Sequence, residues 1–136
     1  MAEIIQLEIV TPERLVVNDT AEYIEIPGRS GHLGVLPGHA PLITELAVGE
    51  ISYRSGNQTR RLAVAWGFAE VLANKVTILA ETAERADEID TARAEAAKKK
   101  AEAALQKSGL EGDKEAQAAL ERAIARLDVA GKSGKQ

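Results

Sequence analysis

The sequence predicts an α+β protein organised by segments, with an amino-terminal antiparallel β-sandwich over residues 1–84 and a carboxyl-terminal antiparallel two-helix hairpin over residues 85–136. Three observations lead to this prediction. Apolar residues alternate with a period of two as far as about Glu84, and short turn signals interrupt the alternation. Beyond Glu84, alanine and charged residues replace the alternation, and glycine and proline become rare. A period of two is typical of half-buried strands, whereas an alanine-rich charged segment is typical of helices.

The predicted strands of the sandwich are six short stretches of alternating apolar residues. They are centred on Ile5–Ile9, Ile24–Ile26, Leu33–Val35, Ile51–Tyr53, Leu62–Val64 and Val76–Ile78. Turn signals between them stand at Asn18-Asp19, Pro27-Gly28, Pro37-Gly38, Ser55-Gly56-Asn57 and Asn74-Lys75. Short strands joined by frequent turns are typical of a sandwich or a flattened barrel, and glycine followed by asparagine favours a tight hairpin.

Two capping residues define the predicted helices. Asp87 is placed to cap the first helix, with Asp90 in the first turn, because negative charge complements the exposed amides at a helix start. Asp113 is placed to cap the second helix, which we expect to run to about Val129 before Gly131 ends it.

The predicted apolar face of the hairpin consists largely of alanine. Its members are Ile89, Ala92, Ala96, Ala103 and Ala104 on the first helix and Leu120, Ile124 and Leu127 on the second, with Ser108–Gly112 as the link. Alanine favours the helix but contributes little burial energy. We therefore expect stable helices whose packing is easily undone; the alternative is a static hairpin docked on the sandwich.

Composition excludes several classes of function. Hydrophobic residues make up 45% and aromatic residues only 3% of the 136 residues, which suits a folded domain and argues against base stacking on exposed rings. Residues 1–86 have a net charge of −4 and residues 87–136 are neutral, so neither part is a polycation for nucleic acid. The longest mostly apolar run is Leu62–Ala69, whereas a membrane-spanning helix needs about 20 residues. Contact with a membrane is expected only through partner proteins.

The side chains available for chemistry do not favour an enzyme. There is no cysteine, His32 and His39 are the only imidazoles, and no phosphate loop, serine elbow or metal-ligand spacing is present. His39 lies between two prolines and is expected to bond locally, and His32 is expected on a solvated or partner-facing surface. Arg122 and Arg126 are like charges at i, i+4, which fit best opposite an anion or an acidic surface; a solvated basic face is the alternative.

The stretch Gly31–Leu42, GHLGVLPGHAPL, with Thr44 after it, resembles the signature of the epsilon subunits of F-type ATP synthases. The resemblance continues through Trp66–Val71, Val76–Ala83 and Ile89–Ala94, in the same order and with the same spacing. It covers nearly the whole chain apart from residues 131–136.

This resemblance implies a non-catalytic rotor subunit in the central stalk of a proton-translocating ATP synthase, coupling the catalytic head to the c ring. The implied partners are the gamma subunit, the c ring and, when the hairpin is extended, the catalytic alpha/beta head. The implied location is the cytoplasmic face of the bacterial cell membrane, as a peripheral protein. The implied contacts to the c ring and gamma are Gly31, His32, Leu33, Pro37, Gly38, His39, Ala40 and Pro41.

The resemblance also implies a regulatory hairpin. In bacterial members the hairpin either folds against the sandwich or extends into the head, where it inhibits ATP hydrolysis. No cofactor is required, but some members bind a regulatory ATP in the folded hairpin. The matching positions here are Glu84, Ile89, Asp90, Arg93, Ala94, Arg122 and Arg126. A nucleotide that prefers the folded hairpin would withdraw it from the inhibitory state, and Arg122→Ala is predicted to abolish nucleotide-dependent melting shifts.

Two readings compete with the rotor subunit. The first is a free-standing β-sandwich binding module in which the hairpin serves for dimerisation; such a chain would form oligomers by itself and would not bind gamma. The second is a nucleic-acid adaptor built on the hairpin, which would need a basic surface that the charge distribution does not supply.

Overall fold

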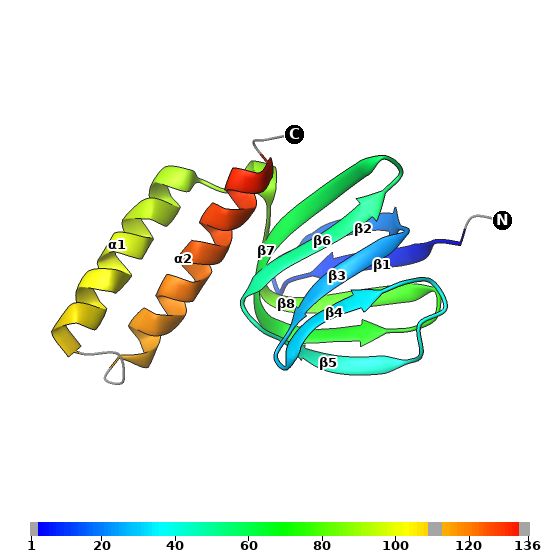
Figure 1. Cartoon of the computed structure of the whole chain (residues 1–136), viewed down its shortest axis with the longest axis horizontal. Coiled ribbons are helices and arrows are strands. Elements are labelled where there is room, and N and C mark those ends of the chain that lie inside the picture. Colours follow the sequence, from blue (N-terminus) through cyan, green and yellow to red (C-terminus); the bar gives the residue numbers. More distant parts are fainter. Residues whose placement is uncertain (1–2, 109–112, 134–136) are drawn as a thin grey trace.

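A computed structural model describes residues 3–108 and 113–133. Within these residues, eight strands are followed by a short 3-10 helix and two α-helices (Figure 1). The elements are β1 (Ile5–Val10), β2 (Leu15–Ala21), β3 (Tyr23–Gly28), β4 (Gly31–Val35), β5 (Leu42–Leu46), β6 (Gly49–Ser55), β7 (Gln58–Val71), β8 (Lys75–Arg85), η1 (Ala86–Glu88), α1 (Thr91–Ser108) and α2 (Lys114–Ser133). This order confirms the predicted sandwich followed by a helical hairpin.

The strands form two layers that share the long strand β7. One layer has the strand order β2-β1-β8-β7-β5. The other has the order β7-β6-β3-β4, because β6 pairs with both β7 and β3, and β3 pairs with β4. A single bridge between Gly28 and Leu46 joins β3 to β5, so the sheet closes on itself as a flattened barrel. All pairs are antiparallel except β1 and β8, which run in parallel because β1 lies between β2 and the returning strand β8. The predicted antiparallel sandwich thus contains one parallel pair, which the prediction did not include.

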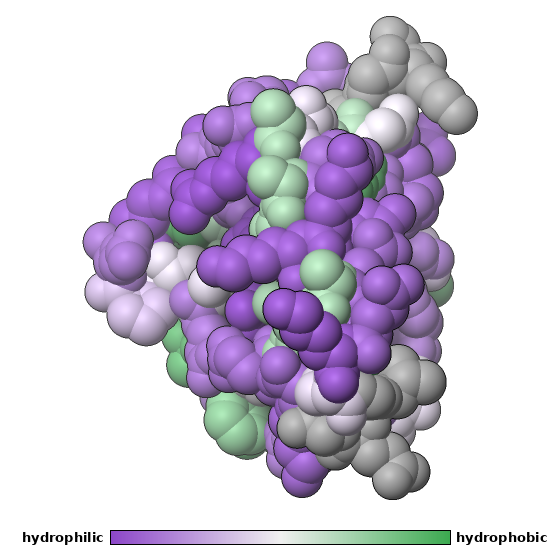
Figure 2. All heavy atoms as spheres, turned by 90° about the vertical axis from the view of Figure 1, so that its left-hand side faces the viewer, coloured by the Kyte–Doolittle hydropathy of each residue, from purple (hydrophilic) through white to green (hydrophobic). Residues whose placement is uncertain are grey.

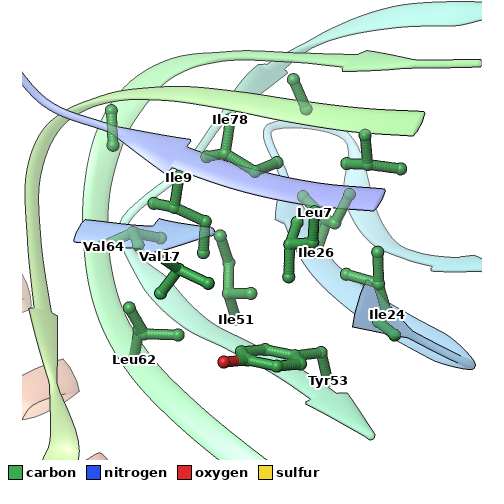
Figure 3. Close-up of a cluster of buried hydrophobic side chains, with 14 of the residues drawn as sticks. Leu7, Ile9, Val17, Ile24, Ile26, Ile51, Tyr53, Leu62, Val64 and Ile78 are labelled. Carbon is green, nitrogen blue, oxygen red and sulfur yellow. The ribbon is translucent and has the colours of Figure 1, made fainter. Parts of the chain in front are cut away.

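The core lies between the two layers and confirms the predicted alternation. Ile5, Leu7 and Ile9 of β1 are completely buried, as are Ile51 of β6 and Ile78 of β8. Side chains from all eight strands contribute to this cluster, part of which is drawn in Figure 3. Each large aliphatic side chain contributes roughly 1.5–3 kcal/mol by leaving water, so this cluster is the main source of the sandwich's stability.

Two strands, β2 and β5, were not predicted, and one turn signal was misread. Asn18-Asp19 was predicted as a turn but lies inside β2, opposite β1. The Asn18 side chain accepts a hydrogen bond from the Gln6 amide at 2.8 Å, and Asp19 accepts one from the Tyr53 hydroxyl at 3.3 Å. Because neighbouring strands satisfy these short polar side chains, they do not break the strand.

The other turn signals are close to the observed reversals. Pro27-Gly28 ends β3, with the turn at residues 29–30, and Pro37-Gly38 forms the turn after β4. Gly56-Asn57 joins β6 to β7, as predicted, and Gly56 has the positive φ of 65° that this hairpin needs.

The first helix begins later than predicted. Residues 86–88 form η1 and Ile89 is extended, with φ −76° and ψ 122°, so a helix cannot begin at Asp87. Instead, the Asp90 carboxylate accepts a hydrogen bond from the Arg93 amide at 3.1 Å and caps α1. The predicted capping by Asp87 was therefore wrong.

The second helix begins as predicted and ends later. Asp113 caps α2 by accepting a hydrogen bond from the Ala116 amide at 2.9 Å. The helix continues through Gly131, where an end was predicted, to Ser133. Lys132 lies 3.2 Å from Asp128 of the same helix and 3.1 Å from Glu50 of β6, and the pair with Glu50 holds the last turn against the sandwich. Of the predicted link, residues 109–112 lie outside the described residues.

The hairpin seam consists largely of alanine, as predicted, but on a different face. The buried residues are Ala94, Ala101 and Leu105 on α1 and Ala116, Ala123 and Val129 on α2. The predicted seam residues Ala92, Ala96, Ala103 and Ile124 are exposed. Because alanine occurs on every side of α1, periodicity alone could not identify the face that packs. The side of the molecule formed by the helices is mostly hydrophilic, with narrow apolar spots (Figure 2).

Neither described helix combines the length and apolar character that crossing a bilayer would require.

Candidate functional site

A pocket of about 390 Å3 lies between the helical hairpin, the end of β8 and the β1–β2 connection. We call it the hairpin pocket, and its lining residues are Thr11, Glu13, Arg14, Glu81, Thr82, Ala83, Glu84, Glu88, Asp90, Arg93, Ala94, Ala97 and Arg126. It exists only while α1 and α2 are docked on the sandwich, because both helices, β8 and the β1–β2 connection contribute to its wall.

Five of the seven residues predicted for ATP line this pocket: Glu84, Asp90, Arg93, Ala94 and Arg126. The guanidinium of Arg126 donates a short hydrogen bond to the Glu84 carboxylate, which joins α2 to β8. Asp90 fixes the first turn of α1 through the Arg93 amide. Among the described residues, no carboxylate lies within ion-pair distance of the Arg93 guanidinium, so Arg93 is the lining arginine available to an anion.

The other two predicted residues, Ile89 and Arg122, do not line the hairpin pocket. Ile89 is half-buried after η1, with its amide 3.4 Å from the Ala86 carbonyl oxygen. The Arg122 guanidinium lies over the Trp66 ring, 5.2 Å from its centroid, and 3.9 Å from Glu115. In this arrangement Arg122 packs α2 onto β7 through a cation–π contact and does not face the pocket.

Sequence reasoning missed the wall of the pocket contributed by the β1–β2 connection. Arg14 donates a 3.0 Å hydrogen bond to Glu88, which also lies 3.4 Å from the Arg85 side chain. The hydrogen bond from Arg14, with the neighbouring charge of Arg85, lowers the pKa of Glu88. Arg14 and Glu88 are far apart in the sequence, and only the parallel pairing of β1 with β8 brings them together. No local signal could have found this contact.

The electrostatics of the hairpin pocket are mixed. Three arginines and five carboxylates line it. Glu84 is paired with Arg126 and Glu88 with Arg14, whereas Glu13, Glu81 and Asp90 line the pocket without an ion-pair partner among the described residues. A highly charged free anion would meet repulsion here, whereas a nucleotide carrying a divalent cation would have less charge to accommodate. In the part of the chain that the structure describes, no group of acidic or histidine side chains is arranged to hold a metal ion by itself.

The residues predicted to contact other subunits form one continuous stretch of surface. Gly31, His32 and Leu33 belong to β4, and His32 is exposed opposite Pro27 of β3. Pro37, Gly38, His39, Ala40 and Pro41 form the connection from β4 to β5.

Local hydrogen bonds hold the connection between β4 and β5. The Gly38 amide donates to the Ala73 carbonyl at 2.7 Å, which ties this loop to the turn between β7 and β8. His39 Nδ1 donates to the Ala40 carbonyl at 2.6 Å. The prediction that His39 is satisfied locally is confirmed.

A second surface that the sequence reasoning missed lies on the outer face of the sheet formed by β5, β7 and β8. Ile43, Phe68 and Leu79 are 70%, 53% and 55% exposed. Phe68 pairs directly with Leu79, and Ile43 is the diagonal neighbour of Phe68, so the three side chains share one face. We call these residues the outer apolar patch. The signal was the nearly continuous apolar run in β7, which is unusual for a strand with one solvated face.

The point at which β7 changes its partner from β6 to β5 is held in a special backbone conformation. Trp66 and Gly67 have φ of 51° and 122°. A Cβ on Gly67 would lie 1.9 Å from the Leu79 carbonyl oxygen, so the close approach of β8 requires glycine here. This geometry presents the Trp66 ring to Arg122 of α2 and so helps to place the hairpin.

Comparison with known proteins gives matches over both parts of the chain. Residues 4–86 match the family described as "ATP synthase, Delta/Epsilon chain, beta-sandwich domain", and residues 87–131 match "ATP synthase, Delta/Epsilon chain, long alpha-helix domain". A protein of Koribacter versatilis named ATP synthase epsilon chain is 65% identical over 82% of this chain and 78% of its own length. A protein of Geobacter metallireducens with the same name is 49% identical over the full length of both chains, 100% of each.

Solved structures share the fold at lower identity. A chain in a cryo-EM structure of the Euglena gracilis mitochondrial ATP synthase (OSCP/F1/c-ring) has a TM-score of 0.73 at 22% identity, covering 100% of this chain and 83% of that chain. A chain in the central stalk and c-ring structure of the Tetrahymena thermophila mitochondrial ATP synthase has a TM-score of 0.51 at 14% identity, covering 95% of each chain.

Proposed function

The chain belongs to the ATP synthase delta/epsilon chain family, and from this premise we propose that it is a non-catalytic rotor subunit coupling the catalytic head of a proton-translocating ATP synthase to the c ring. The observation that carries the proposal is the outer apolar patch on a sandwich whose core is already complete. An exposed apolar cluster on a rigid sheet is suited to permanent burial by a partner.

The partner proposed for the outer apolar patch is the gamma subunit. Phe68 and Leu79 lie on central strands, so the patch is presented on a rigid surface with little conformational entropy to lose on binding. The c ring is the proposed partner of the stretch from β4 to β5, where His32 is exposed and a hydrogen-bonded loop fixes the shape of the surface.

Binding of the purified chain to isolated gamma subunit tests this assignment. Phe68→Ser is expected to weaken binding at least about tenfold, because truncating a buried aromatic anchor costs on the order of 2 kcal/mol or more. Leu15→Ser is the matched control: Leu15 is 52% exposed, like Phe68, but lies on β2 away from the patch. Equal affinity of Phe68→Ser and the unaltered chain, with both folded, would contradict the assignment.

The hairpin is proposed to be the regulatory part, inhibiting ATP hydrolysis when it leaves the sandwich and extends along gamma into the alpha/beta head. The alanine seam supports this proposal, because small buried side chains such as Ala94, Ala101 and Ala123 give the hairpin little burial energy. The contacts to the sandwich include two polar ones, Arg126 with Glu84 and Arg122 with Trp66.

A disulfide that locks the docked hairpin tests this regulation. Thr82 of β8 and Ala125 of α2 line the same narrow gap, and the chain has no cysteine of its own. In the assembled enzyme, oxidised Thr82→Cys/Ala125→Cys is expected to relieve inhibition, and reduction should restore it. Each single-cysteine variant controls for the substitutions. Inhibition that is the same in the locked and reduced states would refute a role for undocking.

The hairpin pocket is the proposed site for a regulatory ATP. Arg93 is the cation available to the phosphates, and Arg126 can exchange its bond to Glu84 for one to the ligand. Because the pocket needs the docked helices, ATP would favour the docked state by its differential affinity and so oppose inhibition. The mixed charge of the lining favours weak binding of magnesium ATP over free ATP.

The proposed location is peripheral, at the cytoplasmic face of the bacterial cell membrane, with membrane contact only through partner subunits. The bacterial relatives named ATP synthase epsilon chain support this location. The competing module that dimerises through its hairpin predicts a dimer in sedimentation equilibrium and no affinity for gamma, so the gamma binding experiment also separates the two readings.

A further inference from the structure

A second and larger pocket, of about 550 Å3, opens at the end of the sandwich between β2, the β6–β7 hairpin and the end of β8. We call it the end pocket, and its lining residues are Val16, Val17, Asn18, Asp19, Tyr53, Gln58, Thr59, Arg60, Arg61, Leu62, Arg85, Ala86 and Asp87. None of them was assigned above to ATP, gamma or the c ring. The volume is in the range of small-molecule sites.

Three arginines line the end pocket, and they differ in how their charge is balanced. Arg61 lies 3.6 Å from the Glu50 carboxylate, and Arg85 lies 3.4 Å from Glu88 and 3.8 Å from Asp87. Arg60 donates a 2.8 Å hydrogen bond to the neutral Gln58 side chain. Among the described residues, no carboxylate lies within ion-pair distance of Arg60.

The carboxylates of the end pocket do not cancel this positive charge. Asp19 is engaged on both oxygens, by the Thr20 amide at 2.8 Å and by the Tyr53 hydroxyl at 3.3 Å. Asp87 is largely exposed and lies near Arg85. Among the described residues that line the end pocket, Arg60 is therefore the guanidinium group that no carboxylate balances, and it lies in a concave site.

Arg60 of β7 and Arg85 of β8 both line the end pocket, on the face of the sheet that carries Tyr53 and Leu62. Arg60 is the cross-strand partner of Tyr53 in the β6–β7 hairpin, and Arg85 is the partner of Leu62 two residues further along β7. Burial raises the pKa of the Tyr53 hydroxyl to about 12, and the charges of Arg60 and Arg85 both oppose this rise. Both arginines are therefore close enough to the Tyr53 hydroxyl for their charges to act on it.

We propose that the end pocket binds an oxyanion of the phosphoryl class, held by the guanidinium groups of Arg60 and Arg85. The planar guanidinium fork matches two phosphoryl oxygens at once, and Arg60 has no carboxylate to release first. The Tyr53 hydroxyl, which donates to Asp19, lines the same pocket. The site is independent of the hairpin pocket, so the failure of either leaves the other standing.

Titration of the full chain with inorganic pyrophosphate, followed by NMR of the arginine Nε–H groups, tests the proposal. The signals of Arg60 and Arg85 are expected to shift with saturation, and Arg60→Gln should weaken binding at least about tenfold, since each charge-assisted hydrogen bond is worth about 1.5–3 kcal/mol. Arg54→Gln is the matched control, because Arg54 is exposed on the same hairpin but does not line the end pocket.

A nucleoside diphosphate and Arg126→Gln separate this site from the hairpin pocket. Arg126→Gln is expected to leave the pyrophosphate affinity unchanged. If the end pocket recognises phosphoryl groups, the nucleoside diphosphate should shift the same Arg60 signal as pyrophosphate. Shifts that grow linearly without saturation, equal losses in Arg60→Gln and Arg54→Gln, or a loss caused by Arg126→Gln would overturn the proposal and leave the three arginines as a solvated surface.

Discussion

The ion pair between Glu84 and Arg126 gives a quantitative test of how the hairpin is held. The two side chains are 33% and 28% exposed, so the pair lies between a surface ion pair and a buried one. We expect Glu84→Gln and Arg126→Gln each to lower the free energy of unfolding by about 1 kcal/mol, with a coupling energy of about 0.5–1 kcal/mol in the double-mutant cycle. A loss of this size would lower Tm by a few degrees.

Guanidinium chloride unfolding followed by fluorescence of Trp66 is the assay, because Trp66 is the only tryptophan and lies against Arg122 of α2. The matched control is the pair Arg29–Glu45, which lies within the sandwich with side chains 76% and 51% exposed, and its coupling should be close to zero. Additivity of Glu84→Gln and Arg126→Gln within about 0.3 kcal/mol would refute the claim that this pair docks the hairpin.

Three further predictions follow from single residues. Because Arg14 lowers the pKa of Glu88, the Tm difference between the unaltered chain and Glu88→Gln should be full above the ordinary pKa of 4.5 and shrink as pH falls through the lowered one; a pH-independent difference would contradict this. Gly67→Ala should lower the stability in thermal denaturation by about 3 kcal/mol or more, through its φ of 122° and a backbone clash, whereas Gly131→Ala should raise it. The stability held by Tyr53 should be full below its ordinary pKa of 10.0 and fall as pH rises through about 12, and Tyr53→Phe should remove this fall.

The fold could be predicted from the sequence because buried residues recur with the period of a β-strand. Ile5, Leu7 and Ile9 could be assigned to the core from their spacing alone, and all three are fully buried. This reasoning failed for β2. Asn18 and Asp19 are typical turn residues, but hydrogen bonds to neighbouring strands keep them in the strand. The turn propensity of such a residue is overridden where a residue distant in the sequence forms a hydrogen bond with its polar side chain.

The candidate site was predictable only in part, because its wall comes from three regions of the chain. The family resemblance implied Asp90 and Arg93 as site residues, and both line the hairpin pocket. Arg122 was grouped with Arg126 because they are one turn apart, but a small rotation about the helix axis directs Arg122 to Trp66. The contribution of Arg14 depends on strand pairing, which no local pattern specifies.

The position of Arg122 changes the earlier expectation about nucleotide sensing. Because Arg122 holds α2 against Trp66 and does not line the hairpin pocket, Arg122→Ala should lower the melting temperature without removing a shift caused by ATP. Arg93→Ala removes the lining cation that no carboxylate balances and should remove the shift itself.

Thermal unfolding of the isolated chain with and without millimolar magnesium ATP tests the claim that the docked hairpin forms a nucleotide-sensing pocket. A ligand that binds only the folded state must raise its apparent stability. We predict a rise in Tm that Arg93→Ala and Arg126→Ala abolish and that Lys99→Ala, on the exposed side of α1, retains. No rise in the unaltered chain, or a rise that persists in Arg93→Ala, would contradict the claim.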